Sequence, residues 1–291
     1  MSFSFPAIFR RPRLTGHRGL FLLCLFLFVL SGFFSFWVFF PARVLQHRLL
    51  QEVSRQTDLN MQGRHATKLF PPGLGLDLTI YPPVAGMTDI ELTELQITPV
   101  WGSLFSENQK VHLEASLAGG ALDAVAARDG QINLEIRDLT LITLQRPELP
   151  FRVSGQLTGQ FAGRNLSQNM DGQGSFSLSI TDLRILGLAR LGLPADLFAG
   201  VLQLEGKVLQ RRISLEKVVL TGGVIELSGG GNILLGKTAD QSRLNLNLRL
   251  YPTATTPDSL QDLFNLTGIR PTADGSYLFR VGGTVAKPSI R

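Results

Sequence analysis

The spacing of hydrophobic residues changes twice along this chain. Residues 20–40 form a run without any charge, residues 43–56 place apolar side chains three to four positions apart, and from Gly73 onward apolar and polar residues alternate. A spacing of three to four residues predicts a helix, and alternation predicts strands of an antiparallel sheet with one covered face. The sequence therefore predicts a long apolar helix, a short amphipathic helix and a large β domain.

The run 20–40 has the length of a membrane-spanning helix. At a rise of about 1.5 Å per residue it spans roughly 31 Å, which matches a hydrocarbon core of about 30 Å. A cleavable signal peptide would have an apolar core of about 7–15 residues, followed by small residues at the cleavage site. Here the run is longer and ends in the bulky sequence Phe-Pro-Ala-Arg at 40–43. We therefore predict that residues 20–40 are retained as a transmembrane helix.

The charges that flank this run predict its orientation. Residues 1–19 contain four Arg and no acid, and they contribute most of the net charge of +5. Because basic flanks stay on the cytoplasmic side, residues 1–19 are predicted to be a cytoplasmic tail and the rest to lie on the far side. In a bacterium with two membranes this is an inner-membrane protein with its bulk in the periplasm. The confinement of the charge to the tail argues against nucleic acid as a partner.

Residues 73–291 are predicted to form one periplasmic β domain, joined to the membrane by a connector at 41–72. About a dozen alternating segments separated by Gly, Pro, Asn or Asp follow Gly73. Two short helices are expected beyond the membrane segment, at 43–56 and 257–266. For the basic residues of 43–56, a solvated helix face is favoured over contact with lipid headgroups. The predicted fold class is all-β, with one N-terminal transmembrane helix.

The motifs that suggest chemistry lack their structural context. Residues 231–238 match the phosphate-binding pattern G-x-x-x-x-G-K-[ST], but Ile233 and its neighbours favour a strand, and no helix is predicted behind the loop. No two histidines have metal-ligand spacing, no serine lies in a nucleophile elbow, and Cys24 is the only cysteine. The sequence thus predicts a protein that is not an enzyme and has no cofactor, no metal and no bound nucleotide.

The order of several strand motifs resembles a known family. These motifs are Leu-Asp-Leu-Thr-Ile at 76–80, Val-His-Leu-Glu-Ala-Ser-Leu-Ala-Gly-Gly at 111–120, Leu-Glu-Gly-Lys-Val at 204–208, Ile-Ser-Leu-Glu-Lys-Val-Val-Leu-Thr-Gly at 213–222 and Asp-Gly-Ser-Tyr-Leu-Phe-Arg-Val-Gly-Gly at 274–283. Their succession is similar to the long, AsmA-like form of the type II secretion protein N (GspN) family. The resemblance implies an inner-membrane accessory of the type II secretion apparatus, related to proteins whose curved sheets cradle lipid. It supplies no catalytic residues.

The covered face of the sheet is the candidate functional surface. A large sheet must hide its apolar face in a barrel, in a sandwich or around a ligand, and two short helices are too little to cover it. The resemblance favours a curved sheet with an apolar groove over a packed sandwich. The candidate lining residues are Leu244, Leu246, Leu248, Ile213 and Leu215.

Two functions follow from these expectations. The first is a role in assembly or stability of the secretion machine, with other type II secretion components as partners. The alternative is a periplasmic module that binds or transfers lipid, with phospholipid acyl chains as ligands.

Overall fold

The computed structural model describes residues 17–39, 42–57, 60–70, 73–82, 87–147, 149–165, 172–236, 238, 241–266 and 269–290. It divides the chain into two compact units, Met1–Pro41 and Ala42–Arg291, and we call the second the β unit. The first unit contains helix α1 (His17–Phe39). Residues 1–16 of the predicted tail, and Phe40 at the end of the apolar run, lie outside the described residues.

Helix formation by the apolar run is confirmed, because α1 covers most of residues 20–40. Within the part of the chain that the structure describes, no helix is long and apolar enough to cross a membrane. Membrane insertion of residues 20–40 therefore stays a prediction.

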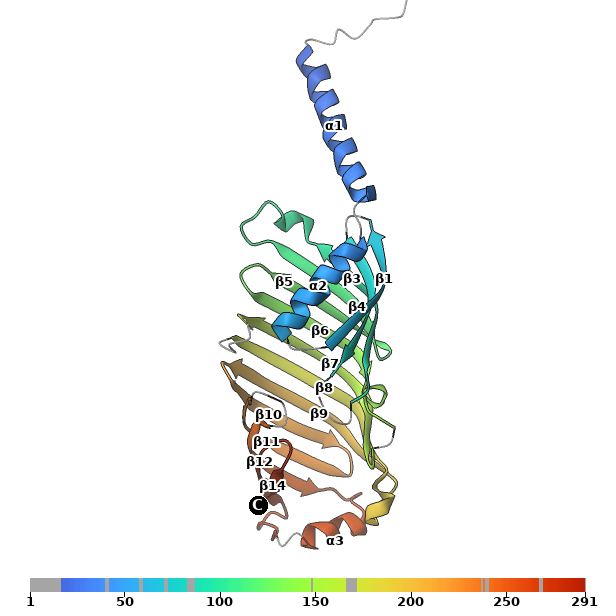
Figure 1. Ribbon diagram of the computed structural model, residues 1–291. Helices are drawn as coiled ribbons and strands as arrows, with labels where there is room; N and C mark the ends of the chain where they lie inside the picture. The colour runs from blue at the N-terminus through green and yellow to red at the C-terminus, as the bar shows by residue number, and fades with distance from the viewer. Residues whose placement is uncertain are drawn as a thin grey trace, which may run out of the picture. The chain divides into compact units, whose positions relative to one another are not determined.

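The described strands of the β unit form one antiparallel sheet in which spatial order equals chain order (Figure 1). Its fourteen strands are β1 (Asn60–Leu69), β2 (Gly73–Tyr81), β3 (Ile90–Pro99), β4 (Lys110–Leu117), β5 (Gly120–Ala127), β6 (Gln131–Thr140), β7 (Arg152–Arg164), β8 (Gln173–Leu186), β9 (Asp196–Leu209), β10 (Arg212–Gly222), β11 (Ile225–Leu234), β12 (Arg243–Pro252), β13 (Tyr277–Gly283) and β14 (Pro288–Ile290). The all-β prediction is confirmed, and the described strands make one continuous sheet rather than two stacked sheets.

The sheet begins earlier in the chain than predicted. Gly73 does start a strand, but β1 precedes it inside the predicted connector 41–72 and pairs along its length with β2. The β structure thus extends back to Asn60, and the connector is reduced to the helix α2 (Ala42–Thr57) and the few residues after it.

β-Bulges interrupt the hydrogen-bonded pairing of several strands and bend these strands. Four of them, in β1, β3, β6 and β8, contain a residue other than Gly with a positive φ: His65, Glu94, Asp138 and Asp182. A bulge inserts an unpaired residue, which bends its strand and increases the local twist. The sheet accordingly curls around its apolar side instead of lying flat (Figure 1).

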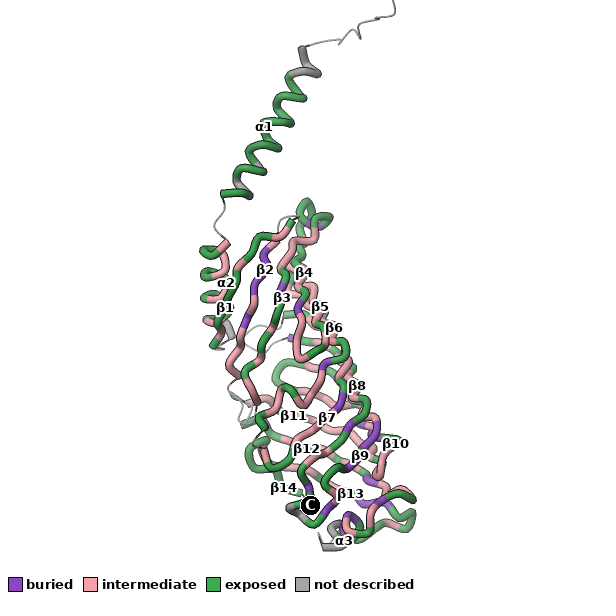
Figure 2. Tube along the Cα trace, turned by 90° about the vertical axis from the view of Figure 1, so that its right-hand side faces the viewer, coloured by how far each residue is buried: buried purple, intermediate pink, exposed green. Residues whose placement is uncertain are grey.

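The described residues of the β unit also form two α-helices and three short 3₁₀ helices. Helix α2, predicted at 43–56, and helix α3 (Asp258–Leu266), predicted at 257–266, are both confirmed; Gly268, the expected end of α3, lies outside the described residues. The 3₁₀ helices are η1 (Trp101–Ser103), η2 (Leu141–Leu144) and η3 (Leu188–Leu191). Buried residues concentrate where α2 and α3 pack, near β2–β3 and near β9 and α3 (Figure 2).

Candidate functional site

The five predicted lining residues share one face of the sheet. Ile213 of β10 pairs with Ile233 of β11, and Ile233 pairs in turn with Leu244 of β12. In the next row Leu215 pairs with Gly231, which pairs with Leu246. Directly paired residues point to the same side of a sheet. The predicted residues, Leu248 included, are therefore brought together across three strands, and all five are half-buried.

On this face, one row of register-paired apolar residues runs across most of the strands of the sheet. We call it the central row. It contains Leu74, Ile97, Leu113, Ala124, Leu134, Phe161, Phe176, Gly206, Leu215, Gly231, Leu246 and Val281. Each member is the register partner of the next, and each is apolar or Gly. At about 4.8 Å between neighbouring strands, a row through twelve strands extends roughly 50 Å.

Glycine within the central row gives space to the large side chains beside it. A Cβ built at Gly206 would lie 2.7 Å from Cζ of Phe176, so the phenyl ring of Phe176 lies over Gly206 in the next strand. A Gly inside a strand commonly marks such a close approach. The face is thus a continuous apolar surface even where the row contains no side chain.

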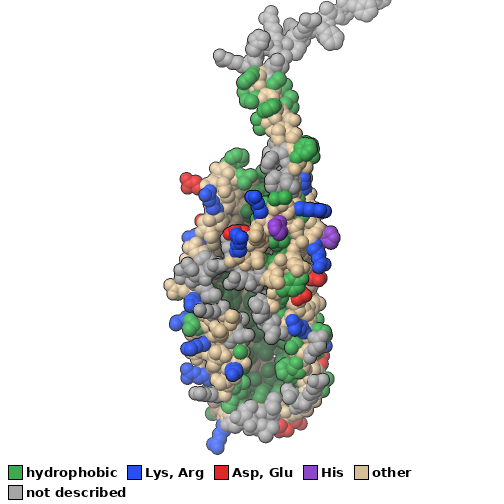
Figure 3. Space-filling model, viewed as in Figure 1, with side chains coloured by type: hydrophobic (Ala, Val, Ile, Leu, Met, Phe, Trp, Pro, Cys, Tyr) green, Lys and Arg blue, Asp and Glu red, His purple; other side chains and the backbone are tan. Residues whose placement is uncertain are grey.

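This apolar face remains partly open. Apart from Leu74 and Gly206, the members of the central row are half-buried rather than buried. Figure 3 shows a hollow in the β unit whose interior is occupied by hydrophobic side chains, with Lys and Arg side chains around its rim. A core that packed against itself would bury these positions, so the middle strands present a concave apolar surface.

Helix α2 covers the apolar face at the first strands. Its residues Ala42, Leu45 and Leu50 pack against a buried cluster of Leu74, Leu76, Leu78, Leu95 and Ala115 from β2, β3 and β4. Val44, Leu49 and Val53 of the same helix are exposed, so α2 docks through only part of its hydrophobic surface.

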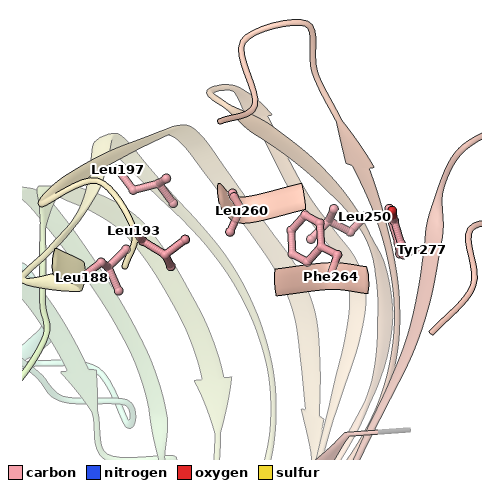
Figure 4. Close-up of a cluster of buried hydrophobic side chains, with 7 residues drawn as sticks. All are labelled: Leu188, Leu193, Leu197, Leu250, Leu260, Phe264 and Tyr277. Atoms are coloured by element: carbon pink, nitrogen blue, oxygen red, sulfur yellow. The ribbon is translucent and has the colours of Figure 1, made fainter. Parts of the chain in front are cut away.

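Helix α3 covers the other end of the same face. Leu260 and Phe264 pack against Leu250 and Tyr277 (Figure 4), and the rings of Phe264 and Tyr277 lie 5.3 Å apart. A loop after β8 adds Leu188 and Leu193 to the same cluster. Covered at both ends and open between them, the apolar face forms a hollow rather than a closed core.

The opposite face of the sheet is polar and carries cross-strand ion pairs. Glu216 lies 2.6 Å from Nζ of Lys207, and Glu205 lies 2.9 Å from Nζ of Lys217. These side chains are about half exposed, so each pair contributes little to stability. The acids that alternate with apolar residues along these strands thus form a solvated face, as the sequence predicts.

One group on the polar face has the composition of a metal site. His112 Nε2 lies 2.9 Å from Oδ2 of Asp123 and 3.5 Å from Oε1 of Glu114, and among the described residues these three could hold a metal ion. The sequence did not predict this group, because Asp123 reaches it only through the pairing of β4 with β5. Exposed groups of this kind are common without a metal.

The phosphate-binding pattern lies in a strand, as expected from its apolar loop positions. Gly231 to Leu234 belong to β11 and pair with both β10 and β12, so their backbone N–H groups are arranged in a ladder. Lys237 lies outside the described residues. A strand cannot curl its N–H groups around phosphates, and this geometry gives no support to nucleotide binding.

Comparison with known proteins found no matching family model, no matching curated protein and no matching solved structure. The resemblance to the GspN family therefore stays a prediction from the sequence.

Proposed function

We propose that this protein binds lipid acyl chains in the hollow on its apolar face while residues 20–40 hold it in the bacterial inner membrane. The observation that carries the proposal is the central row: twelve register-paired positions, all apolar or Gly, most of them half-buried. Apolar surface left in contact with water is unfavourable in proportion to its area, and extended apolar patches mark binding surfaces.

The chemistry of the hollow favours a hydrocarbon ligand over a polar one. Its row has no hydroxyl, amide or charged side chain, so nothing there would orient a polar group. The central row, whose first members α2 covers, extends roughly 50 Å, whereas the hydrocarbon core of a bilayer is about 30 Å thick. The proposal includes the curved sheet with an apolar groove that the AsmA-like resemblance implies.

The test is a lipid measurement on the full-length protein with a matched pair of substitutions. Protein purified in mild detergent is expected to carry phospholipid detectable by native mass spectrometry. Leu246→Asp places a charge on the apolar face and should reduce the bound lipid, whereas Asn247→Asp, the next residue on the opposite face, should not. Lipid-free protein, or equal loss in both variants, would contradict the proposal.

An accessory role in type II secretion is a second proposal, and it rests on the order of the sequence motifs alone. In a bacterium that secretes through this apparatus, deletion of the gene should reduce the amount of secreted substrate. Complementation separates the two proposals: a Leu246→Asp protein that restores secretion fully would show that secretion does not need the hollow.

A further inference from the structure

A second cavity lies between α2 and the edge strand β1. It has a volume of about 870 Å³, and the described residues that line it belong to these two elements. Among the described residues, three Arg and two His line it and no Asp or Glu does: the basic residues are Arg43, His47, Arg55, Arg64 and His65. The cavity is therefore distinct from the middle of the hollow in both position and charge.

The packing of α2 on β1 forms this cavity. Gly63 of β1 faces α2, and a Cβ there would collide with the side chains of Gln46 and Leu50. The absence of a side chain at Gly63 lets α2 approach the edge of the sheet closely. Six consecutive residues of β1, 61–66, line the cavity, so inward and outward positions of this edge strand both contribute to it.

Two of the guanidinium groups that line the cavity make no ion pair. Among the described residues, neither Arg43 nor Arg64 makes an ion pair or a side-chain hydrogen bond, and both side chains are exposed. His65 differs, because its Nδ1 lies 3.1 Å from Oδ2 of Asp77. Two cations without an ion pair thus line the cavity, Arg43 from α2 and Arg64 from β1, and Arg64 is the register partner of Asp77 on the outward side of the strand.

The floor of the cavity is apolar and continuous with the apolar face. Leu50, Met61 and Ala66 line the cavity, and all three also pack against the buried cluster of Leu74, Leu76 and Leu78. A ligand that filled the cavity would therefore contact cations at its mouth and hydrocarbon at its base. Inorganic phosphate would use only the first of these two features.

We infer that this cavity binds the phosphate of an anionic phospholipid headgroup, with the acyl chains continuing onto the apolar face. Guanidinium groups bind phosphate oxygens through paired, charge-assisted hydrogen bonds, which is why Arg is the usual residue at such sites. The acyl-chain part of this inference rests on the proposed function. The headgroup part rests on Arg43, Arg64 and the shape of the cavity.

The experiment measures headgroup preference in the full-length protein in mild detergent. The probes are phosphatidylglycerol and phosphatidylcholine with the same acyl chains, and inorganic phosphate as a competitor. The unsubstituted protein should bind phosphatidylglycerol about tenfold more tightly. Arg43→Gln/Arg64→Gln should remove this preference and leave phosphatidylcholine binding unchanged, and Arg43→Lys/Arg64→Lys, which keeps both charges, should retain part of it.

The matched control removes two Arg elsewhere. Arg212→Gln/Arg243→Gln alters exposed residues of β10 and β12 and should leave the preference intact. Equal binding of the two lipids by the unsubstituted protein, or equal loss in the control, would overturn the headgroup site. Competition by phosphate at the affinity of the lipid would indicate a site for free phosphate and overturn the lipid assignment. If the acyl-chain proposal itself fails, neither lipid binds, which is a different result.

Discussion

The carboxylate of Asp77 accepts a hydrogen bond of 3.1 Å from the backbone N–H of Glu94. Glu94 is the bulge residue of β3 with a φ of 54°, and Asp77 lies on the neighbouring strand β2. On its other side Asp77 contacts His65, the bulge residue of β1. One side chain therefore connects the bulges of two strands that flank its own.

Removing this carboxylate should destabilise the first strands of the sheet. We expect Asp77→Ala to lower the free energy of unfolding by about 1 kcal/mol, a moderate value because the side chain is partly exposed. Thermal or chemical unfolding measures the change. Asp89→Ala, which removes an exposed Asp outside the strands, should have almost no effect. An equal effect of the two substitutions would show that the bridge between the bulges is not stabilising.

The glycine at 229 permits close pairing of β11 with β12. A Cβ at Gly229 would collide with the carbonyl oxygen of Asn247 and come within 2.9 Å of Cδ2 of Leu248. Gly229→Ala should therefore destabilise the protein by about 1–3 kcal/mol, as overpacking usually does. The matched change Gly282→Ala meets only the Ser289 hydroxyl, at 3.4 Å, and should be tolerated. Comparable unfolding midpoints for the two variants would contradict this account.

At low pH, the free energy of unfolding should depend on the ionisation of Asp274. Hydrogen bonds from the hydroxyl groups of Thr272 and Ser276 and from the backbone N–H of Ser276 lower the pKa of Asp274 from 3.8 to about 2. A folded-state pKa below the unfolded value means that the ionised group stabilises the fold above pH 3.8, and that this contribution is lost as the pH falls to about 2. Asp274→Asn should remove this part of the pH dependence, and Asp262→Asn in α3 should leave it unchanged. Unfolding curves recorded across this pH window test the difference.

Membrane topology can be tested with reporter fusions. A reporter that is active only in the periplasm should be active when it is fused after Arg291, because the basic tail predicts a cytoplasmic N-terminus. The same fusion should be inactive when the four Arg of residues 1–19 are replaced by Glu, since the charge bias is then reversed. Activity of a cytoplasmic reporter at the same position would contradict the orientation.

The regular strands could be predicted because their alternation is clean. Leu244, Leu246 and Leu248 alternate with polar residues, and this alone places them on one face. β1 was missed for the opposite reason. Its inward positions include Gly63 and Ala66, which give a weak hydrophobic signal, and the bulge at His65 shifts the period by one residue. A search for strict alternation passes over such a strand.

The basic cavity could not be predicted, because its two sides come from different elements. Arg43 and Arg64 are 21 positions apart, and nothing in the sequence pairs a helix with an edge strand. The one sequence feature that points to the cavity is Gly63, which lies between polar residues in β1. Its role becomes clear only in the structure, where the side chain of Leu50 packs against it. His112 and Asp123 on the polar face could not be paired from the sequence either, because the register of β4 with β5 brings them together.

The strand order has a consequence for how the chain folds. Each described strand pairs only with its immediate neighbours in the chain, so no pairing waits for a distant part of the chain. Sheets built from sequence-local contacts fold faster than those that require long loops to close. Each strand can therefore add to the edge left by the previous strand as soon as it has been synthesised. Assembly of the sheet can then keep pace with synthesis, and an incomplete sheet has a single growing edge at any moment.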